Sequence, residues 1–481
     1  MKMNTIIKYL AVPVLLLIMA GCSKDKLEEI NVNKNNPLDV PSRLLITDVI
    51  TKTAFSITGS DFAFYASVYT EHNVGIYNQM YNAEIRSAEP ALATTYNNTW
   101  GSVYETLYNL KIIIDKTSDE GDEAGNYHTL GIAQVLTAYN LAILTDLMGD
   151  VPYTEALQPG VIFQPKLDKQ EDLYNEVFRL LDEGIANMGK ETTAAGLGTQ
   201  DFLYGGDIGK WTQFAYGLKA RYTARLAFRN GGKWEDVITF ANQSFTSVAD
   251  EAKFVYNGSS TNSPFYTFFI DRDYFGASTS LHNKLTQRND PRDGVFFIPY
   301  PGTGSVEFAP NGAPSQVQGF YGISGVMSST APTYLLSYHE LEFLKAEAYA
   351  RLSGVASADA QAALEGALTA AFAKVGMDLD STYWVDEVLP LFTADPVREI
   401  MVQKYISFFE SEAVEAYNDI RRLKALGENF ITLENPNNAT QFPQRFTYGA
   451  DDVTTNLNIA DAYGNGSYVY TEKVWWAGGT R

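Results

Sequence analysis

The residue types that most often carry enzymatic chemistry are sparse in this sequence of 481 residues. Its four histidines are widely separated, at His72, His128, His282 and His339. None of them stands in the His-Glu-x-x-His spacing of a zinc site, and the glycines around Ser324 lack the G-x-S-x-G spacing of a serine hydrolase. Carboxylates are numerous enough for a glycosidase pair, but no spacing singles one out. We therefore expect a protein that is not an enzyme and has no cofactor.

One stretch imitates the opening of a calcium loop. Asp271 and Asp273 precede Gly276 in the expected order, yet Phe275 and His282 stand where oxygen ligands are needed. The acidic turn at 119–125 could also attract a divalent cation. A surface turn is the plainer interpretation of both stretches. We expect no metal site, with a structural Ca²⁺ as an alternative.

The single cysteine indicates a different covalent chemistry. Cys22 follows two lysines and an apolar run from Tyr9 to Ala20, the layout of a secretory signal. That run of about 12 residues is too short to span a membrane, which needs roughly 20. Residues 19 to 22 have the pattern of a lipobox, in which the cysteine becomes the acylated first residue. We predict a lipoprotein signal peptide at 1–21 and lipidation of Cys22, with acyl chains such as palmitate anchoring the protein to a membrane.

Composition excludes one class of partner. The formal net charge is −21, so the chain should repel phosphate backbones, and we expect no nucleic-acid partner. Hydrophobic residues make up 45% of the chain, which is enough for a packed core. Tyrosine is abundant, with 30 residues against 6 tryptophans. Its apolar ring and hydroxyl suit surfaces that bind polar ligands.

Apolar residues recur at helical spacing in paired segments. Trp100, Val103 and Leu107 repeat every three or four residues, the pattern stops at the acidic turn, and it resumes over 130–148. A helix hairpin of this kind buries its apolar face only by stacking on a neighbour. We predict a mainly α fold with four tetratricopeptide-like helix pairs, at about 91–148, 169–230, 334–376 and 395–426.

The remaining stretches do not fit long helices. Residues 250–332 and 434–481 are rich in glycine, proline, asparagine and aromatic residues, which predicts long loops with a few short strands. Loops of this length on a helical body are more often functional than not. Residues 22–41 are polar and contain two prolines, so we predict a lipidated tether that precedes one domain at 42–481. A first helix is expected after Pro41.

An ordered set of short motifs spans nearly all of the chain after Cys22. The motifs are Trp100 with Tyr104 and Leu107, then 144–153, 289–292, 341–349 and 415–422. Together with the lipobox and the Asn-rich tether, this set resembles the SusD/RagB family of nutrient-binding outer-membrane lipoproteins. One departure is the mixed charge of residues 23–26, where family members often carry acidic residues.

The resemblance implies a helical body that supports an irregular ligand-binding lobe. Proteins of this family are not enzymes. They act at the cell surface as a lid over a SusC-like TonB-dependent transporter barrel, and they capture oligosaccharides or, in some members, peptides. We therefore expect an outer-membrane receptor for oligosaccharide. Two alternatives stay open: the same architecture binding oligopeptides, and a helical-repeat scaffold without a small ligand.

A sugar-binding site needs flat aromatic rings with hydrogen-bonding groups at their edges. Two stretches offer both, residues 61–86 and the aromatic loops after 264. The candidate binding residues are Tyr69, Tyr77, Asn78, Tyr81 and Arg86 in the first stretch, and Tyr274, Phe275 and Tyr321 in the second. Tyr69 also fits helical spacing, so a core position is an alternative for it. We favour Tyr77 and Tyr81, which lie beside a glycine and several side-chain amides.

Overall fold

The computed structural model describes residues 40–481, so the predicted signal peptide, Cys22 and nearly all of the predicted tether lie outside the described residues. The first described helix, α3 (Ser42–Lys52), begins directly after Pro41, where a first helix is expected. The backbone N–H of Ser42 donates to Glu123 over 2.9 Å. The acidic turn at 119–125 therefore supplies a cap for the start of α3.

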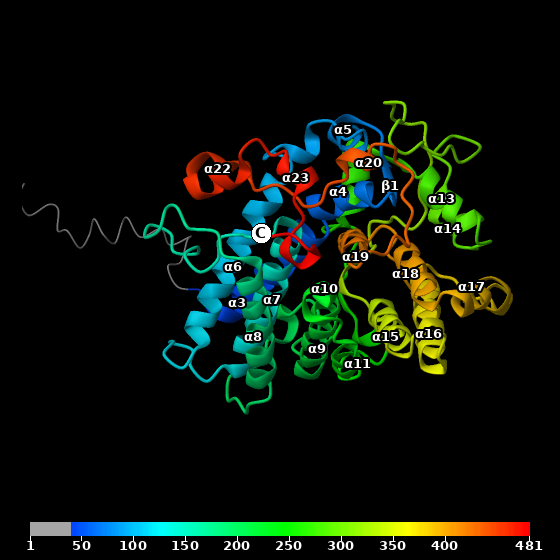
Figure 1. The fold of residues 1–481 in the computed structure, drawn as a ribbon. Helices are drawn as coiled ribbons and strands as arrows, with labels where there is room; N and C mark the ends of the chain where they lie inside the picture. Colours follow the sequence, from blue (N-terminus) through cyan, green and yellow to red (C-terminus); the bar gives the residue numbers. More distant parts are fainter. Residues whose placement is uncertain (1–39) are drawn as a thin grey trace, which may run out of the picture. The chain divides into compact units, whose positions relative to one another are not determined.

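Helices dominate the described chain (Figure 1). The four predicted regions contain α6 (Asn97–Thr117) and α7 (Tyr127–Met148), α8 (Gln170–Met188) and α9 (Ile208–Arg225), α15 (Tyr338–Ser353) and α16 (Ala358–Lys374), and α18 (Pro396–Ser407) and α19 (Ala413–Ala425). Helix α7 packs between α6 and α8, α8 also packs on α9, and α15 packs on α16. The prediction of a mainly α fold is confirmed.

The last two helices pack mainly on other partners. Helix α18 packs against α15, whereas α19 packs against α4 (Asp61–Tyr69), which lies far away in the sequence. Helix α11 (Trp234–Ala241) contacts both α9 and α15 and so joins the two halves of the helical body. These long-range contacts close the helix pairs into one unit, Ser42–Arg481.

The sequence pattern predicts one apolar face for helix α7, but this helix is buried on all sides. Every residue from Thr129 to Met148 is buried, because α3, α6, α8 and α9 all pack on this helix. Within the described residues it is the one helix long and apolar enough to span a membrane by composition. Its complete burial identifies it as a core helix.

The predicted irregular lobe contains short strands and short helices. Its elements are β2 (Ala252–Phe254), α12 (Pro264–Arg272), β3 (Phe275–Ala277), α13 (Thr279–Thr286), α14 (Asp293–Phe296), β4 (Phe297–Ile298), β5 (Ile323–Ser324) and β6 (Thr333–Leu336). The strands form three antiparallel pairs, β2 with β6, β4 with β5, and β3 with β1 (Asn73–Gly75). The third pair joins the lobe to the N-terminal part of the domain.

Helix α12 forms where the sequence predicts a loop. Pro264 occupies the first turn, where its missing N–H costs little. The rings of Phe265 and Phe268 pack against Phe64 of α4, with centroids 4.9 and 4.5 Å apart. Tertiary packing therefore stabilises a helix that the local composition does not favour.

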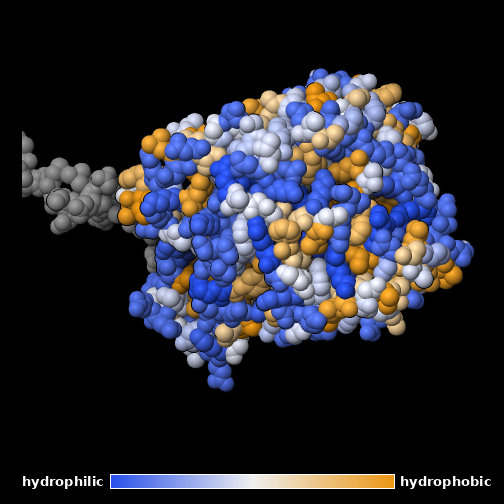
Figure 2. All heavy atoms as spheres, in the orientation of Figure 1, coloured by the Kyte–Doolittle hydropathy of each residue, from blue (hydrophilic) through white to orange (hydrophobic). Residues whose placement is uncertain are grey.

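Short helices complete the described chain. They are α5 (Asn78–Glu84), α10 (Ala227–Asn230), α17 (Leu389–Ala394), α20 (Asn438–Gln441), α21 (Ala450–Thr455), α22 (Leu457–Tyr463) and α23 (Tyr468–Thr471), with π-helical turns at Thr53–Thr58 and Tyr383–Val388. The C-terminal tail thus carries helical turns as well as loops. The face in Figure 2 is largely hydrophilic, with hydrophobic residues in scattered clusters, in keeping with the strong net charge.

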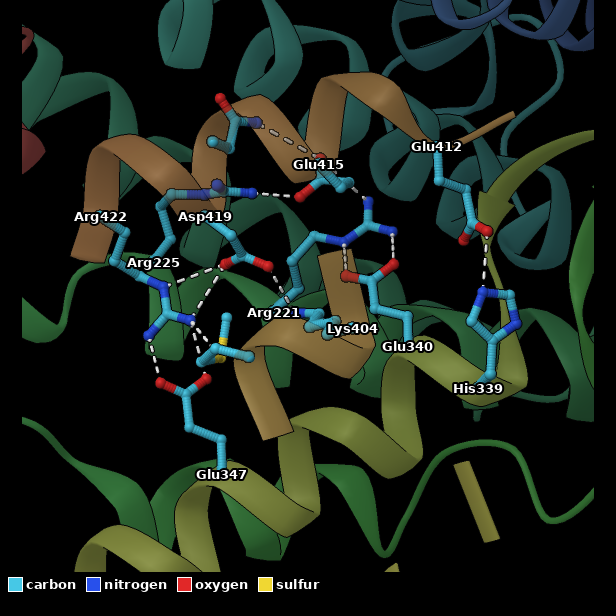
Figure 3. Close-up of polar contacts among 12 residues, drawn as sticks. Arg221, Arg225, His339, Glu340, Glu347, Lys404, Glu412, Glu415, Asp419 and Arg422 are labelled. Atoms are coloured by element: carbon cyan, nitrogen blue, oxygen red, sulfur yellow. Dashed lines mark hydrogen bonds and ion pairs between the residues drawn. The ribbon is translucent and has the colours of Figure 1, made fainter. Parts of the chain in front are cut away.

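Charged side chains fill the junction between α9, α15, α18 and α19 (Figure 3). We call this set the charged junction; its members are Arg221, Arg225, Glu340, Glu347, Lys404, Glu415, Asp419 and Arg422. The side chain of Arg422 lies 2.7 Å from Glu347 and 3.0 Å from Asp419. Burial alone would raise the pKa of Glu347, but Arg422 and Arg351 lower it to about 2. Burial of these charges is tolerated because each carboxylate has a cationic partner.

Candidate binding site

Three of the predicted binding residues come together where the start of α5 meets the lobe. The rings of Tyr77 and Tyr274 lie 5.6 Å apart between centroids and are inclined by 39°. The Asn78 side-chain amide donates to the Tyr274 hydroxyl over 3.2 Å. Tyr77 is half-buried and Asn78 is exposed. We call Tyr77, Asn78 and Tyr274 the tyrosine platform. Tyr77 and Asn78 supply its accessible surface, whereas Tyr274 is only 9% exposed and supports the Tyr77 ring from behind.

The pairing of β1 with β3 positions this platform. Gly75 lies opposite Phe275, and the N–H of Ile76 donates to the carbonyl of Tyr274 over 2.9 Å. In an antiparallel pair the end of one strand meets the start of the other, so Tyr77 and Tyr274 lie at the same end. A Cβ on Gly75 would come within 1.9 Å of the Met80 carbonyl oxygen. Glycine at position 75 therefore allows the tight turn into α5.

Asp273 connects the platform to a second aromatic surface. One of its carboxylate oxygens accepts from the Tyr300 hydroxyl over 3.1 Å and from the N–H of Gly319 over 3.0 Å. These bonds hold the turn at 318–320 beside Tyr300. In that turn Phe320 is 47% exposed, and its ring meets Tyr321 edge-on. Tyr300 and Phe320 are thus additional candidates for ligand contact.

Tyr321 is among the predicted binding residues, whereas its neighbour Phe320 is not. The Gly-Phe-Tyr-Gly pattern was the available signal, but it does not show which ring faces solvent. Tyr321 is 5% exposed and its hydroxyl accepts from the N–H of Ser315 over 2.9 Å. Phe275 is 8% exposed and packs against Phe64. Tyr321 and Phe275 therefore support the lobe from within, whereas Tyr81 lies half-buried on α5, one helical turn after Tyr77.

Tyr69 and Arg86 lie in the interior, which corrects their assignment as ligand-contacting residues. Tyr69 is fully buried, and its hydroxyl shares a 2.9 Å hydrogen bond with Tyr96. The Arg86 guanidinium lies over the Tyr69 ring and donates to the Ala83 carbonyl over 2.6 Å and to Asn438 over 2.9 Å. Both side chains support α5 from the interior. Their polar groups already have hydrogen-bond partners inside the protein, so they are not available to a ligand.

A buried carboxylate links α5 to the lobe and the C-terminal tail. Glu84 accepts from the N–H of Gly312 over 2.6 Å, from the Asn435 amide over 3.0 Å and from the N–H of Gly75 over 3.4 Å. Burial raises the pKa of Glu84 to about 7, although Arg86 and the N–H groups oppose the shift. Glu84 therefore connects α5 to the loop at Gly312, to the C-terminal tail at Asn435 and to strand β1 at Gly75.

The stretch that imitates a calcium loop has another role. Asp273 uses its carboxylate to bind Tyr300 and Gly319, and Asp271 is exposed. Within residues 40–481 no group of three or more histidine, cysteine or acidic side chains is placed to hold a metal ion. The described site is therefore one of aromatic rings, amides and hydroxyls.

A helical body that braces a loop-rich lobe with exposed aromatic rings defines a class of ligand-binding proteins. The family model described as "Starch-binding associating with outer membrane" matches residues 34–449. The chain therefore belongs to the SusD-like family. It is a nutrient-binding protein of an outer-membrane-associated family, and it has no catalytic function.

Solved structures share the fold of this chain. A SusD/RagB family protein from Bacteroides thetaiotaomicron is 44% identical, with a TM-score of 0.86, over 92% of this chain and 100% of that chain. A chitin-binding SusD homolog from Flavobacterium johnsoniae is 19% identical, with a TM-score of 0.73, over 90% and 98% of the two chains. A further chitin-binding protein is 22% identical, with a TM-score of 0.72, over 91% and 99% of the two chains. No curated protein sequence matches the chain.

Proposed function

We propose that the protein captures oligosaccharides on the tyrosine platform. The observation that carries this proposal is the inclined pair of Tyr77 and Tyr274 with Asn78 at its edge. Sugar rings present apolar C–H faces that pack on aromatic rings, and their hydroxyls pair with amide and phenol groups. Affinities in the micromolar to millimolar range, about −8 to −4 kcal/mol, would suit capture followed by release.

The names of the relatives indicate which glycans to test first. The family description names starch, and two of the similar structures are called chitin-binding. The platform has no charged member, which suits neutral sugars of either kind. Starch and chitin oligosaccharides are therefore the first ligands to test.

We also propose delivery to a SusC-like TonB-dependent transporter in the outer membrane. The supporting feature is an exposed apolar patch formed by Val161, Phe163 and Leu457, which are 71%, 78% and 66% exposed. The Asn458 amide donates to the Gln164 carbonyl over 3.0 Å, so the two segments of the patch lie side by side. Exposed apolar patches of this kind mark interaction sites. Lipidation of Cys22 would hold the protein at the cell surface.

The patch can be tested by co-purification of the full-length protein with its transporter. Phe163→Ser should reduce the amount of recovered complex severalfold, because the most exposed ring of the patch is lost. Phe228→Ser is the matched control, since Phe228 is 42% exposed outside the patch. Equal recovery with both variants would remove the patch from the proposal.

The platform is tested by calorimetry with a glycan panel. Tyr77→Ala should weaken the best oligosaccharide about tenfold, since a lost aromatic contact of about 1.4 kcal/mol has that effect. Tyr108→Ala is the control, because Tyr108 is 36% exposed on α6, away from the lobe. Unchanged binding in Tyr77→Ala would rule the platform out. Binding of peptide pools in place of glycans would favour the oligopeptide alternative.

A further inference from the structure

A pocket separate from the tyrosine platform lies between the lobe and the helical body. It has a volume of about 240 Å³ and is lined by residues of α12, the loop at 326–332, the start of β6, the end of α16 and the connection between α18 and α19. Its walls include Phe265, Tyr334, Phe409, Lys374, Glu410 and Ser411. It shares no residue with the platform. Ligand pockets usually measure about 300–1,000 Å³, so this one suits a molecule the size of a single ring.

Glu410 is a buried acid without a counter-ion in this pocket. Its side chain is 6% exposed, and it accepts a hydrogen bond from the Ser324 hydroxyl through one oxygen. The nearby Lys374 ammonium is committed elsewhere, because it lies 2.7 Å from Glu412 and donates to the Ser407 carbonyl over 3.2 Å. No ion pair of Glu410 is present among residues 40–481. A buried carboxylate in this state favours a cation brought by a ligand.

Two further features belong to residues that line this pocket. The Ser411 hydroxyl oxygen is buried and has no hydrogen-bond partner in the described part of the chain. Glu410 has a φ angle of +66°, a conformation that L-residues rarely adopt and that recurs at binding sites. Burial raises the pKa of Glu410 to about 7, while Ser324 and Lys374 oppose the shift. A cation beside the carboxyl would favour its ionised form.

We propose that this pocket binds a small primary amine with a compact apolar body. The ammonium group donates to the free oxygen of Glu410 and to the Ser411 hydroxyl. The apolar body packs among Phe265, Phe409 and Tyr334. The site does not depend on the proposed glycan function of the tyrosine platform.

A matched pair of probes tests the charge requirement. Cyclohexylamine and cyclohexanol have the same ring and differ by an ammonium in place of a hydroxyl. Calorimetry with the full chain at pH 8 should show at least tenfold tighter binding of cyclohexylamine. Equal binding of the two probes would overturn the proposal, as would no binding of the amine at about 10 mM, where a millimolar site would fill.

Variants locate the effect in the pocket. Glu410→Gln keeps the shape and should abolish the preference for the amine, whereas Glu365→Gln, an exposed acid on α16, should leave it intact. Val375→Trp is designed to fill the pocket while residue Glu410 stays unchanged. This variant should remove the binding of both probes. Tyr77→Ala should change neither affinity. Retention of the amine preference in Glu410→Gln, or of binding in Val375→Trp, would place the amine elsewhere and contradict the assignment.

Discussion

The charged junction and the lobe are held together in different ways. In the junction, side chains of opposite charge meet between helices, as when Arg221 contacts Glu340 over 2.5 Å. In and around the lobe, single carboxylates accept hydrogen bonds from the backbone of loops, as Asp273 does within the lobe and Glu84 does from the neighbouring α5. The junction therefore specifies how helices pack, whereas the lobe carboxylates hold irregular segments that have few backbone partners of their own.

Because of this difference, stability and ligand binding should depend on different residues. A change in the junction leaves a buried charge without a partner, and that cost is felt by the whole domain. A change at the surface of the lobe alters ligand contacts and leaves the helical body intact. Members of one family can thus differ in their aromatic surfaces while they share a scaffold. Four variants test this separation, from the largest expected effect to the smallest.

The largest effect is expected from Arg422→Ala. This change leaves Glu347 and Asp419 buried with fewer cationic partners, so the free energy of unfolding should fall by about 3–5 kcal/mol in chemical denaturation. Arg398→Ala is the control, since the Arg398–Asp395 pair is exposed at 50% and 45%. It should cost less than about 1 kcal/mol. Similar losses in both variants would contradict a special role for the buried junction.

A pH-dependent effect is expected from Glu84. Its folded-state pKa of about 7 lies above the ordinary value of 4.5, so the folded protein holds the proton more tightly than the unfolded chain. Stability should therefore fall as the pH rises from 4.5 to about 7, by at most about 1.4 kcal/mol per pH unit. Glu84→Gln should flatten this part of the curve of melting temperature against pH. An unchanged slope in the variant would show that Glu84 does not titrate in this range.

Asp273→Ala should act locally. The loss of its carboxylate frees the N–H of Gly319 and the Tyr300 hydroxyl, so hydrogen exchange at 318–320 should become faster. Global stability should change by about 1 kcal/mol or less. Asp271→Ala serves as the control because Asp271 is exposed. A global loss of protection in Asp273→Ala would place this residue among the determinants of the whole fold.

Tyr77→Ala should change stability least of all while it weakens glycan binding. The ring of Tyr77 is half-buried and packs on Tyr274, so its removal leaves no buried charge. A thermal melt of the variant beside the calorimetric titration separates the two effects. A large drop in melting temperature would show that the Tyr77 ring, like Tyr274, belongs to the core.

The helical body could be predicted from sequence because its apolar residues repeat with the period of a helix. The same pattern could not show that α7 is covered on every side, since it contains no information on neighbouring helices. The acidic and basic residues of 341–349 and 415–422 look like solvated helix faces in isolation. Their burial follows from contacts between segments far apart in the sequence, such as Glu347 with Arg422.

The candidate site was harder to predict for the same reason. Tyr77 and Tyr274 are brought together by β1 and β3, which have three residues each and are too short to show a strand pattern. Tyr69 and Tyr77 look alike in sequence, yet one lies in the core and the other half-exposed. Helix α12 escaped prediction because ring packing against Phe64 outweighs its unfavourable composition.

The most direct test of the account is a crystal structure of the protein with its best-binding oligosaccharide. We expect a sugar ring against the half-buried Tyr77, with a hydroxyl bonded to Asn78, and an unchanged charged junction. An oligosaccharide bound at any other surface, with the tyrosine platform left in water, would contradict the central claim.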